Sequence, residues 1–134
     1  MTDTLTVAIM DAPYEAAAST TAFRIIAAAL RKGIDVNVFA YEGAVSLTVK
    51  DQAPHANPVK GTSVEEEDHP TTKDLVAALV QLGKGDPTLT WVNCGLCVDE
   101  RGAGNWIDGV KRGSPADFLK MAGASTTTLV TPTK

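Results

Sequence analysis

Apolar residues along the chain form short runs and longer periodic segments, and the two kinds of pattern alternate. The runs at 4–10, 34–43, 88–94 and 125–131 contain mainly β-branched and apolar residues, and each is too short for a stable helix. These four runs predict strands. Residues 44–49 fit an extension of the second strand, a separate short strand or the start of a helix, and the pattern does not decide among them.

The segment between the first two strands has a helical pattern. Within residues 14–33, Phe23, Ile26 and Leu30 recur at helical spacing among many alanines. A basic pair precedes Gly33, which can adopt the left-handed conformation that ends a helix. The pattern predicts an alanine-rich helix that ends at this glycine.

Two further helices are predicted from their end signals. Segment 71–83 begins with Thr71 and Asp74 in capping-box spacing and ends at Gly83. Segment 114–123 carries an N-cap serine, a proline at the first helical position, an acid three residues after the cap and a C-cap glycine. These residues are Ser114, Pro115, Asp117 and Gly123.

Strands that alternate with helices predict an α/β fold. We expect a single three-layer domain over residues 1–134, with a parallel sheet of four or five strands and helices on both faces. Reactive groups of such sheets gather at the carboxyl ends of the strands. Cys94 ends the predicted strand 88–94, so we expect it at this edge.

Residues 51–70 interrupt this alternation with a long polar loop. The segment holds three prolines, one glycine and five acidic residues. Because loops above ~15 residues in compact domains are usually functional or disordered, two hypotheses follow. The loop is more mobile than the rest of the chain, or it shields the cysteine site of its own or a neighbouring subunit.

Composition excludes several classes of function. The balance of 44% hydrophobic and 21% charged residues is that of a globular domain, and the net charge of −4 with no Lys/Arg run argues against nucleic-acid or anionic membrane binding. No apolar run approaches the ~20 residues of a membrane helix. The N-terminus lacks the pattern of a secretory signal, so we expect a reducing, cytoplasmic location.

The most reactive stretch is WVNCGLCVDERGA at 91–103, which contains both cysteines. A thiol acts as a nucleophile only when it is ionised, and nearby cations favour the thiolate. Gly95 would let backbone N–H groups approach a sulfur anion, and Arg101 would supply a positive charge, although the following acids oppose it. Cys94 and Cys97 are therefore candidate catalytic residues.

Other roles for the two cysteines remain open at this point. Both thiols could be small buried hydrophobic side chains without chemistry, or a dithiol redox pair of thioredoxin type. A zinc site would need His55 and His69 as additional ligands, but both lie in the long loop without paired spacing. We expect no metal, and the absence of a P-loop or dinucleotide fingerprint leads us to expect no nucleotide cofactor.

The stretches CGLCVDERGA at 94–103 and IDGVKRGSPADFLKMA at 107–122 resemble the DsrE/DsrF/TusD-like sulfur-relay family. The opening strand with its alanine-rich helix and YEGAV at 41–45 add to the resemblance, which extends over nearly the whole chain. It implies a flavodoxin-like domain that assembles into trimers or hexamers. It also implies a cysteine that carries sulfane sulfur as a persulfide.

The resemblance assigns roles to particular residues. In the TusD-like branch the carrier cysteine lies eight residues before the glycine of an Arg-Gly pair, as Cys94 does before Gly102. Cys97 matches a second cysteine found in a subset of the family, and Arg101 with Gly102 matches the Arg-Gly pair. Residues 51–70 depart from compact members of the family, which puts the partner surface in doubt.

The sequence therefore predicts a cytoplasmic sulfur carrier or sulfurtransferase-like protein. Its partners would be sulfur donor and acceptor proteins or low-molecular thiols, and it would be a homo-oligomer. The alternatives are a non-catalytic oligomeric binding module with structural thiols and a dithiol redox protein. Reactive thiols would distinguish a sulfur carrier from a binding module with structural thiols. Retention of loaded sulfur would distinguish it from a dithiol redox protein.

Overall fold

Five parallel strands form one sheet at the centre of the domain. The structure is a computed structural model that describes residues 3–14, 17–67 and 70–132. The strand order is β4-β3-β2-β1-β5. The strands are β1 (Thr4–Ile9), β2 (Asp35–Ala40), β3 (Leu89–Cys94), β4 (Val110–Gly113) and β5 (Thr127–Val130).

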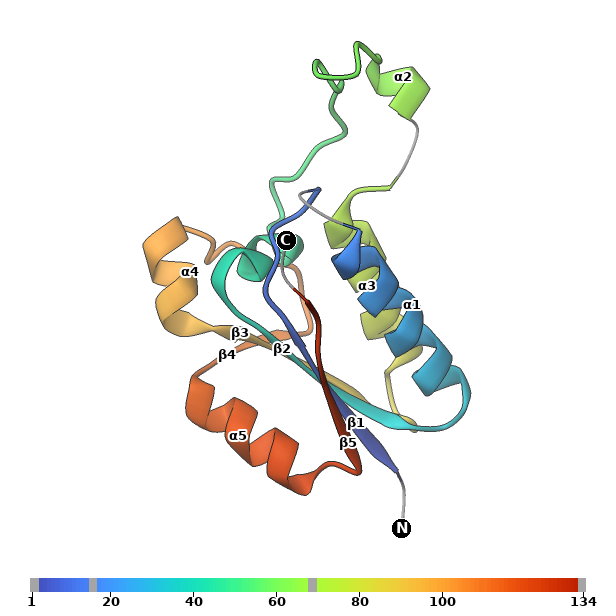
Figure 1. Ribbon diagram of the computed structural model, residues 1–134, viewed down its shortest axis with the longest axis vertical. Coiled ribbons are helices and arrows are strands. Elements are labelled where there is room, and N and C mark those ends of the chain that lie inside the picture. Colours follow the sequence, from blue (N-terminus) through green and yellow to red (C-terminus); the bar gives the residue numbers. More distant parts are fainter. Residues whose placement is uncertain (1–2, 15–16, 68–69, 133–134) are drawn as a thin grey trace.

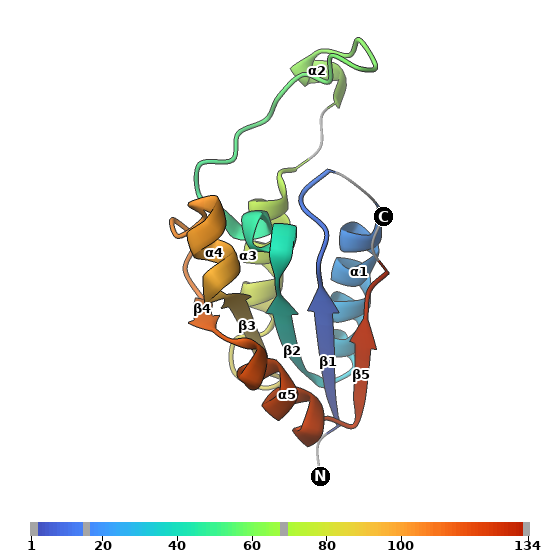
Figure 2. The ribbon, with the colours of Figure 1, turned by 60° about the vertical axis from the view of Figure 1, so that its left-hand side comes forward.

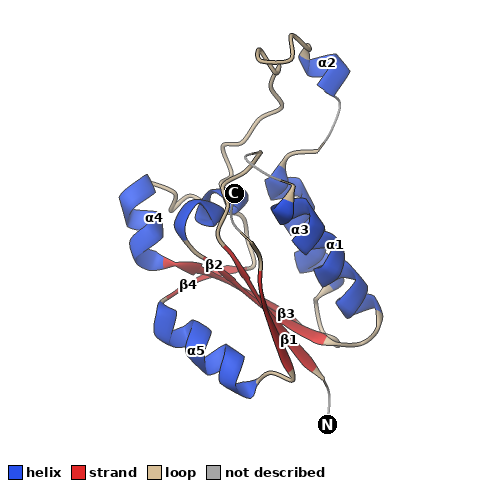
Figure 3. Ribbon diagram, viewed as in Figure 1, coloured by secondary structure: helices blue, strands red, loops and turns tan. Residues whose placement is uncertain are grey.

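Helices cover both faces of this sheet, as Figures 1 and 3 show. Helices α1 and α3 lie side by side on one face, and α4 and α5 lie on the other. The predicted three-layer α/β fold is therefore confirmed. The helices are α1 (Ala18–Arg31), α2 (Val64–Glu67), α3 (Thr72–Leu82), α4 (Gly95–Arg101), α5 (Pro115–Ala124) and a 3-10 helix, η1 (Glu42–Thr48).

Two expectations about the elements need correction. The undecided segment 44–49 belongs mostly to η1, and the second strand ends at Ala40 rather than at residue 43. The last long helix, α5, extends through Ala124, so Gly123 lies inside it and Ser125 is the C-cap. Gly33 does follow α1 with a φ of 81°, as its left-handed role predicts.

Strand β4 is absent from the prediction because its sequence carries little strand signal. Of the residues in VKRG only Val110 is apolar, and Lys111 and Arg112 are exposed. Charged residues are common on edge strands, where they discourage pairing with other chains. The segment therefore forms a strand because it pairs with β3, and its own hydrophobic pattern contributes less.

The core has one layer on each face of the sheet. Val38, Trp91 and Ile26 belong to the layer between the sheet and the α1/α3 pair, and each is fully buried. Phe39 and Val92 belong to the layer beneath α5, together with both cysteines. Because successive side chains of a strand point to opposite faces of the sheet, neighbours such as Trp91 and Val92 pack in opposite layers.

Residues 51–67 form a protruding arm. Figure 2 shows the arm rising beyond the carboxyl ends of the strands, with α2 at its far end. Asn57 and Thr62 exchange backbone hydrogen bonds of 3.0 and 3.1 Å, and no residue of α2 is buried. No described helix is long and apolar enough to cross a membrane.

Candidate functional site

Cys94 lies where β3 ends and α4 begins. It is the last residue of β3 and the N-cap of α4, and it pairs in register with Gly113 of β4. The prediction that Cys94 lies at the carboxyl end of a strand is confirmed. Cys97 follows in the first turn of α4, and both cysteines are free thiols.

Both thiols are buried rather than open to a pocket. Cys94 is 4% exposed and Cys97 is 8% exposed. They pack in the layer that includes Phe39 and Val98, with Phe118 of α5 packed against it. A large cleft lies elsewhere, between α1 and α3, and neither cysteine lines it. The described geometry thus gives no support to the prediction that the sulfur of Cys94 faces a pocket.

The environment of Cys97 favours its neutral form. Burial raises the pKa of the Cys97 thiol, and the hydrogen bond and charge of Cys94 raise it further. The backbone N–H of Glu42 donates to the Cys97 Sγ at 3.0 Å, which opposes this shift in pKa. The two cysteines therefore interact, and the net effect on Cys97 is a raised pKa.

Glu42 contacts the site from the end of β2. It has a φ of 51°, a left-handed conformation that is uncommon for a residue other than glycine. This conformation accompanies the N–H contact with Cys97, while the carboxylate accepts a hydrogen bond from Arg101 at 3.0 Å. Glu42 is not among the site residues predicted from the sequence, although its position just after a strand marks the edge where reactive groups gather.

Arg112 is the second missed residue, and it lies beside Cys94. A Cβ on Gly95 would meet the Arg112 Nε at 2.6 Å, so the glycine leaves room for this side chain. The charge of Cys94 contributes to the raised pKa of Arg112, after the larger effect of Asp99. Asp99 accepts hydrogen bonds from both terminal nitrogens of Arg112, at 3.0 and 2.7 Å.

Arg101 and Gly102 have structural roles that the sequence left open. Arg101 donates to the Cys97 carbonyl oxygen at 3.4 Å and pairs with Glu42, so its described contacts are with backbone and carboxylates. Gly102 has a φ of 61° and ends α4. The cation beside Cys94 is therefore Arg112, where the sequence suggested Arg101.

A buried polar network holds η1 against β3, next to Cys94. The Trp91 Nε1 donates to the Asn93 Oδ1 at 3.1 Å, and the Asn93 Nδ2 donates to the Thr48 Oγ1 at 3.0 Å. Asn93 and Thr48 are fully buried, so these bonds satisfy groups that water cannot reach. Because η1 begins at Glu42, the network also fixes the residue that contacts Cys97.

Ligands for a metal do not come together in the described part of the chain. No group of three or more His, Cys, Asp and Glu side chains is placed to hold an ion there. His55 lies in the arm, where its ring meets the Tyr14 ring edge-on at 5.2 Å. His69, the other ligand considered for zinc, lies outside the described residues.

Comparisons with known proteins agree with this architecture. A model of the DsrE/DsrF-like family matches residues 3–131. The crystal structure of the ychN protein from E. coli is similar, with a TM-score of 0.69 and 20% sequence identity over 97% of this chain and 99% of that chain. At this identity the likeness is one of fold. A comparison with curated proteins gives no match.

Proposed function

Since the chain belongs to the DsrE/DsrF-like family, we propose that it is a sulfur carrier that holds sulfane sulfur as a persulfide on Cys94. The observation that carries the proposal is the interacting pair of reduced thiols at the carboxyl end of β3. A single buried thiol would fit a packing role. Two neighbouring thiols beside an arginine fit sulfur chemistry better.

Loading begins when the Cys94 thiolate attacks the outer sulfur of a persulfide, R–S–SH. The S–S bond of the donor breaks, a new S–S bond forms on Cys94, and the donor leaves as R–SH after taking up a proton. No external oxidant is needed, because the sulfane sulfur moves without a net change in electrons. Arg112, beside Cys94, would stabilise the anionic sulfur during this exchange.

Release can follow two routes that both conserve atoms and electrons. An acceptor thiol can attack the outer sulfur, which regenerates the Cys94 thiol and leaves the sulfur on the acceptor. Alternatively, Cys97 can attack the inner sulfur, which forms a Cys94–Cys97 disulfide and releases hydrogen sulfide. The second route needs a low-molecular thiol to reduce the disulfide afterwards. The raised pKa of Cys97 makes it a slow nucleophile at neutral pH, which favours the first route.

The partners in this proposal are donor and acceptor proteins or low-molecular thiols in the cytoplasm. The protein itself would be a homo-oligomer, with a trimer or hexamer favoured. Burial of both sulfurs means that a donor gains access only when the layer under α5 opens. The same burial favours a second candidate, a binding module in which the thiols only fill space.

Intact-protein mass spectrometry separates these candidates. The reduced protein is incubated with polysulfide, freed of excess reagent and weighed before and after treatment with a reductant. We expect the wild type to gain sulfur that the reductant removes, Cys94→Ser to gain none, and Cys97→Ser to load but release sulfur differently. Failure of the wild type to load supports structural thiols, whereas a disulfide without added sulfur supports a redox protein.

A further inference from the structure

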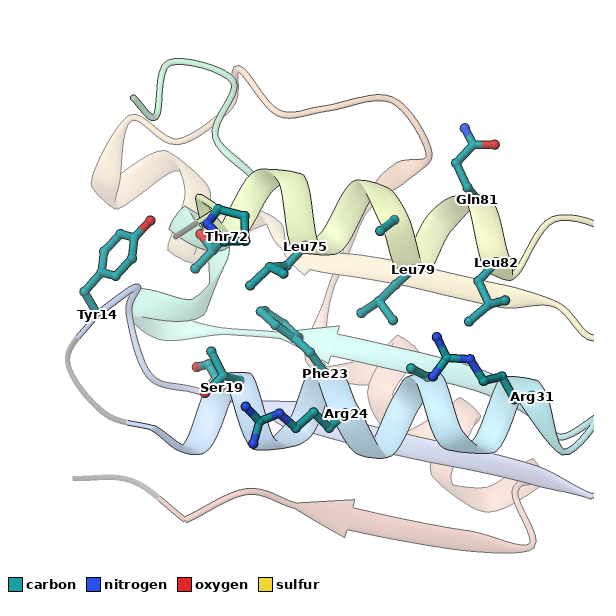
Figure 4. A pocket seen from close by; sticks show the side chains of 14 residues that line it. Tyr14, Ser19, Phe23, Arg24, Arg31, Thr72, Leu75, Leu79, Gln81 and Leu82 are labelled. Atoms are coloured by element: carbon teal, nitrogen blue, oxygen red, sulfur yellow. The ribbon is translucent and has the colours of Figure 1, made fainter. Parts of the chain in front are cut away.

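An open groove of about 1000 Å³ runs between α1 and α3, on the face of the sheet opposite the cysteines. In Figure 4, Phe23 of α1 points toward Leu75 of α3. The apolar lining is Phe23, Ala27, Leu75, Ala78, Leu79 and Leu82. Helical grooves of this kind commonly receive an apolar segment of a partner.

The described charged residues that line the groove are both arginines. Arg24 and Arg31 lie two turns apart on α1, and among the residues that the structure describes no acidic side chain lines the groove. Neither arginine forms a salt bridge within the described residues. A segment that binds here should therefore combine apolar side chains with carboxylates.

The arm of residues 51–67 has this combination. It carries four acidic residues and one lysine, and its tip exposes Val59 by 94% and Val64 by 40%. Glu65 and Glu66 follow Val64 directly, and neither forms a salt bridge in the described ranges. An exposed apolar tip with adjacent carboxylates matches the groove in both respects.

The base of the arm is tied to the domain through Gln52, which bonds to Thr72 and to the Lys73 N–H, but the tip projects outward. Figures 1 and 2 show it projecting away from the sheet and from the α1/α3 pair. A cavity of about 290 Å³ lies between α2 and the body of the domain, lined by Val64 and Glu65 on one side and by Tyr14 and Thr71 on the other. Val59, at 94% exposure, is therefore the residue of the tip most open to another molecule.

We propose that the arm of one copy of this chain docks in the α1/α3 groove of a second copy. Thr72, the first residue of α3, lines one end of the groove, and the arm leaves the domain at that same end. Two copies related by a two-fold axis near this point would each place an arm over the other's groove. Val59 and Val64 would contact the apolar lining, while Glu65 and Glu66 would pair with Arg24 and Arg31.

Photo-cross-linking tests where the arm lies. The photoreactive residue p-benzoylphenylalanine replaces Val59, and isotope-labelled and unlabelled proteins are mixed before irradiation. We expect cross-links between labelled and unlabelled chains that map to α1 or α3, and none to that groove from the same probe at the exposed Leu119. Cross-links confined to one chain, cross-links to another surface, or no cross-links would overturn the proposal.

Charge reversal tests the ion pairs. Arg24→Glu with Arg31→Glu, or Glu65→Arg with Glu66→Arg, should each weaken arm-dependent association by about tenfold or more, since like charges then face each other. All four changes together should restore most of the association. Reversal of the exposed Asp3 and Asp108 to arginine changes the net charge as the glutamate reversal does and is its matched control.

Analytical ultracentrifugation measures association, and thermal unfolding confirms that each variant is folded. The proposal is wrong if neither reversal weakens association, if the combined variant fails to recover it, or if the control weakens it equally. None of these measurements depends on sulfur loading at Cys94. The docking proposal can therefore fail while the carrier proposal holds, and the reverse.

Discussion

At the scale of single residues, the sequence identifies the thiols but not all of their surroundings. The motif marks Cys94, Cys97, Gly95, Arg101 and Gly102, and the structure brings all of them together around α4. The Cys-x-x-Cys spacing and the strand end were enough for this. What each supporting residue contacts depends on chain segments that are distant in sequence, and a local motif carries no information about them.

The two missed residues illustrate this limit. Glu42 reaches Cys97 from the start of η1, and Arg112 reaches Gly95 from β4. Arg112 lies in a strand too short and too charged to be recognised by pattern. The motif pointed to Arg101 as the cation, whereas the charge of Cys94 acts on Arg112, which the pairing of β3 with β4 places next to this strand end.

Gly95→Ala should lower the reactivity of Cys94 without unfolding the protein. The new methyl group would lie 2.6 Å from the Arg112 Nε, and the end of that flexible side chain can move away. Loss of the cation should slow alkylation of Cys94 several-fold, about as much as Arg112→Gln does. The rate is measured in a Cys97→Ser background, with the exposed Lys111→Gln as control. Unchanged rates in both variants would show that Arg112 does not act on the thiol.

Cys94→Ala should shift the pH dependence of Cys97 alkylation to lower pH. Two of the effects that raise the pKa of Cys97 come from Cys94, and both disappear with its sulfur. Because the folded pKa is raised, the thiolate forms only at higher pH in the wild type, and the variant should reach half of its maximum rate earlier. The midpoint of the rate–pH curve is measured with iodoacetamide. A midpoint that stays in place would mean that the two thiols are not coupled.

At the scale of elements, helices and strands with a strong hydrophobic pattern were predicted well, and those with a weak pattern were not. The periodic helices α1 and α3 and the apolar strands β1 and β3 lie within a residue or a few of their predicted ends. In contrast, η1 and β4 depend on contacts with their neighbours. Thr48 of η1 bonds to Asn93, and β4 pairs with β3, so tertiary structure determines both elements.

Asn93→Ala should destabilise the domain by about 1–3 kcal/mol, because buried hydrogen-bonding groups on Trp91 and Thr48 would lose their partner. Urea unfolding monitored by tryptophan fluorescence measures the change. Asn105→Ala is the control, since Asn105 is exposed and its contacts with Asp51 are 3.3 and 3.4 Å long. Equal effects of the two substitutions would argue that the buried network contributes little to stability.

At the scale of the whole molecule, one edge of the sheet is largely uncovered. Every residue of β5 is exposed, and α5 has no buried residue. Leu119 and Val130 are 70% and 61% exposed. Exposed apolar side chains on these two elements are candidates for contact with another subunit.

We therefore expect a homo-oligomer, with a trimer or hexamer favoured, when the mass is measured by light scattering at micromolar concentration. Leu119→Arg should lower the measured mass, because it places a charge on the exposed apolar surface of α5. The neighbouring Lys120→Gln, which is also exposed, should leave the mass unchanged. A wild type that scatters as a 14.0 kDa monomer would contradict the prediction.

The central claim is that sulfur first resides on Cys94, and peptide mapping after a single loading tests it most directly. The protein is mixed with an equimolar persulfide donor, blocked with an alkylating reagent and digested with trypsin. Cleavage after Lys84 and Arg101 releases residues 85–101, which contain both cysteines, and fragmentation between them locates the added sulfur. We predict that the sulfur lies on the fragment with Cys94. Sulfur found first on Cys97, or on neither cysteine, would contradict the account.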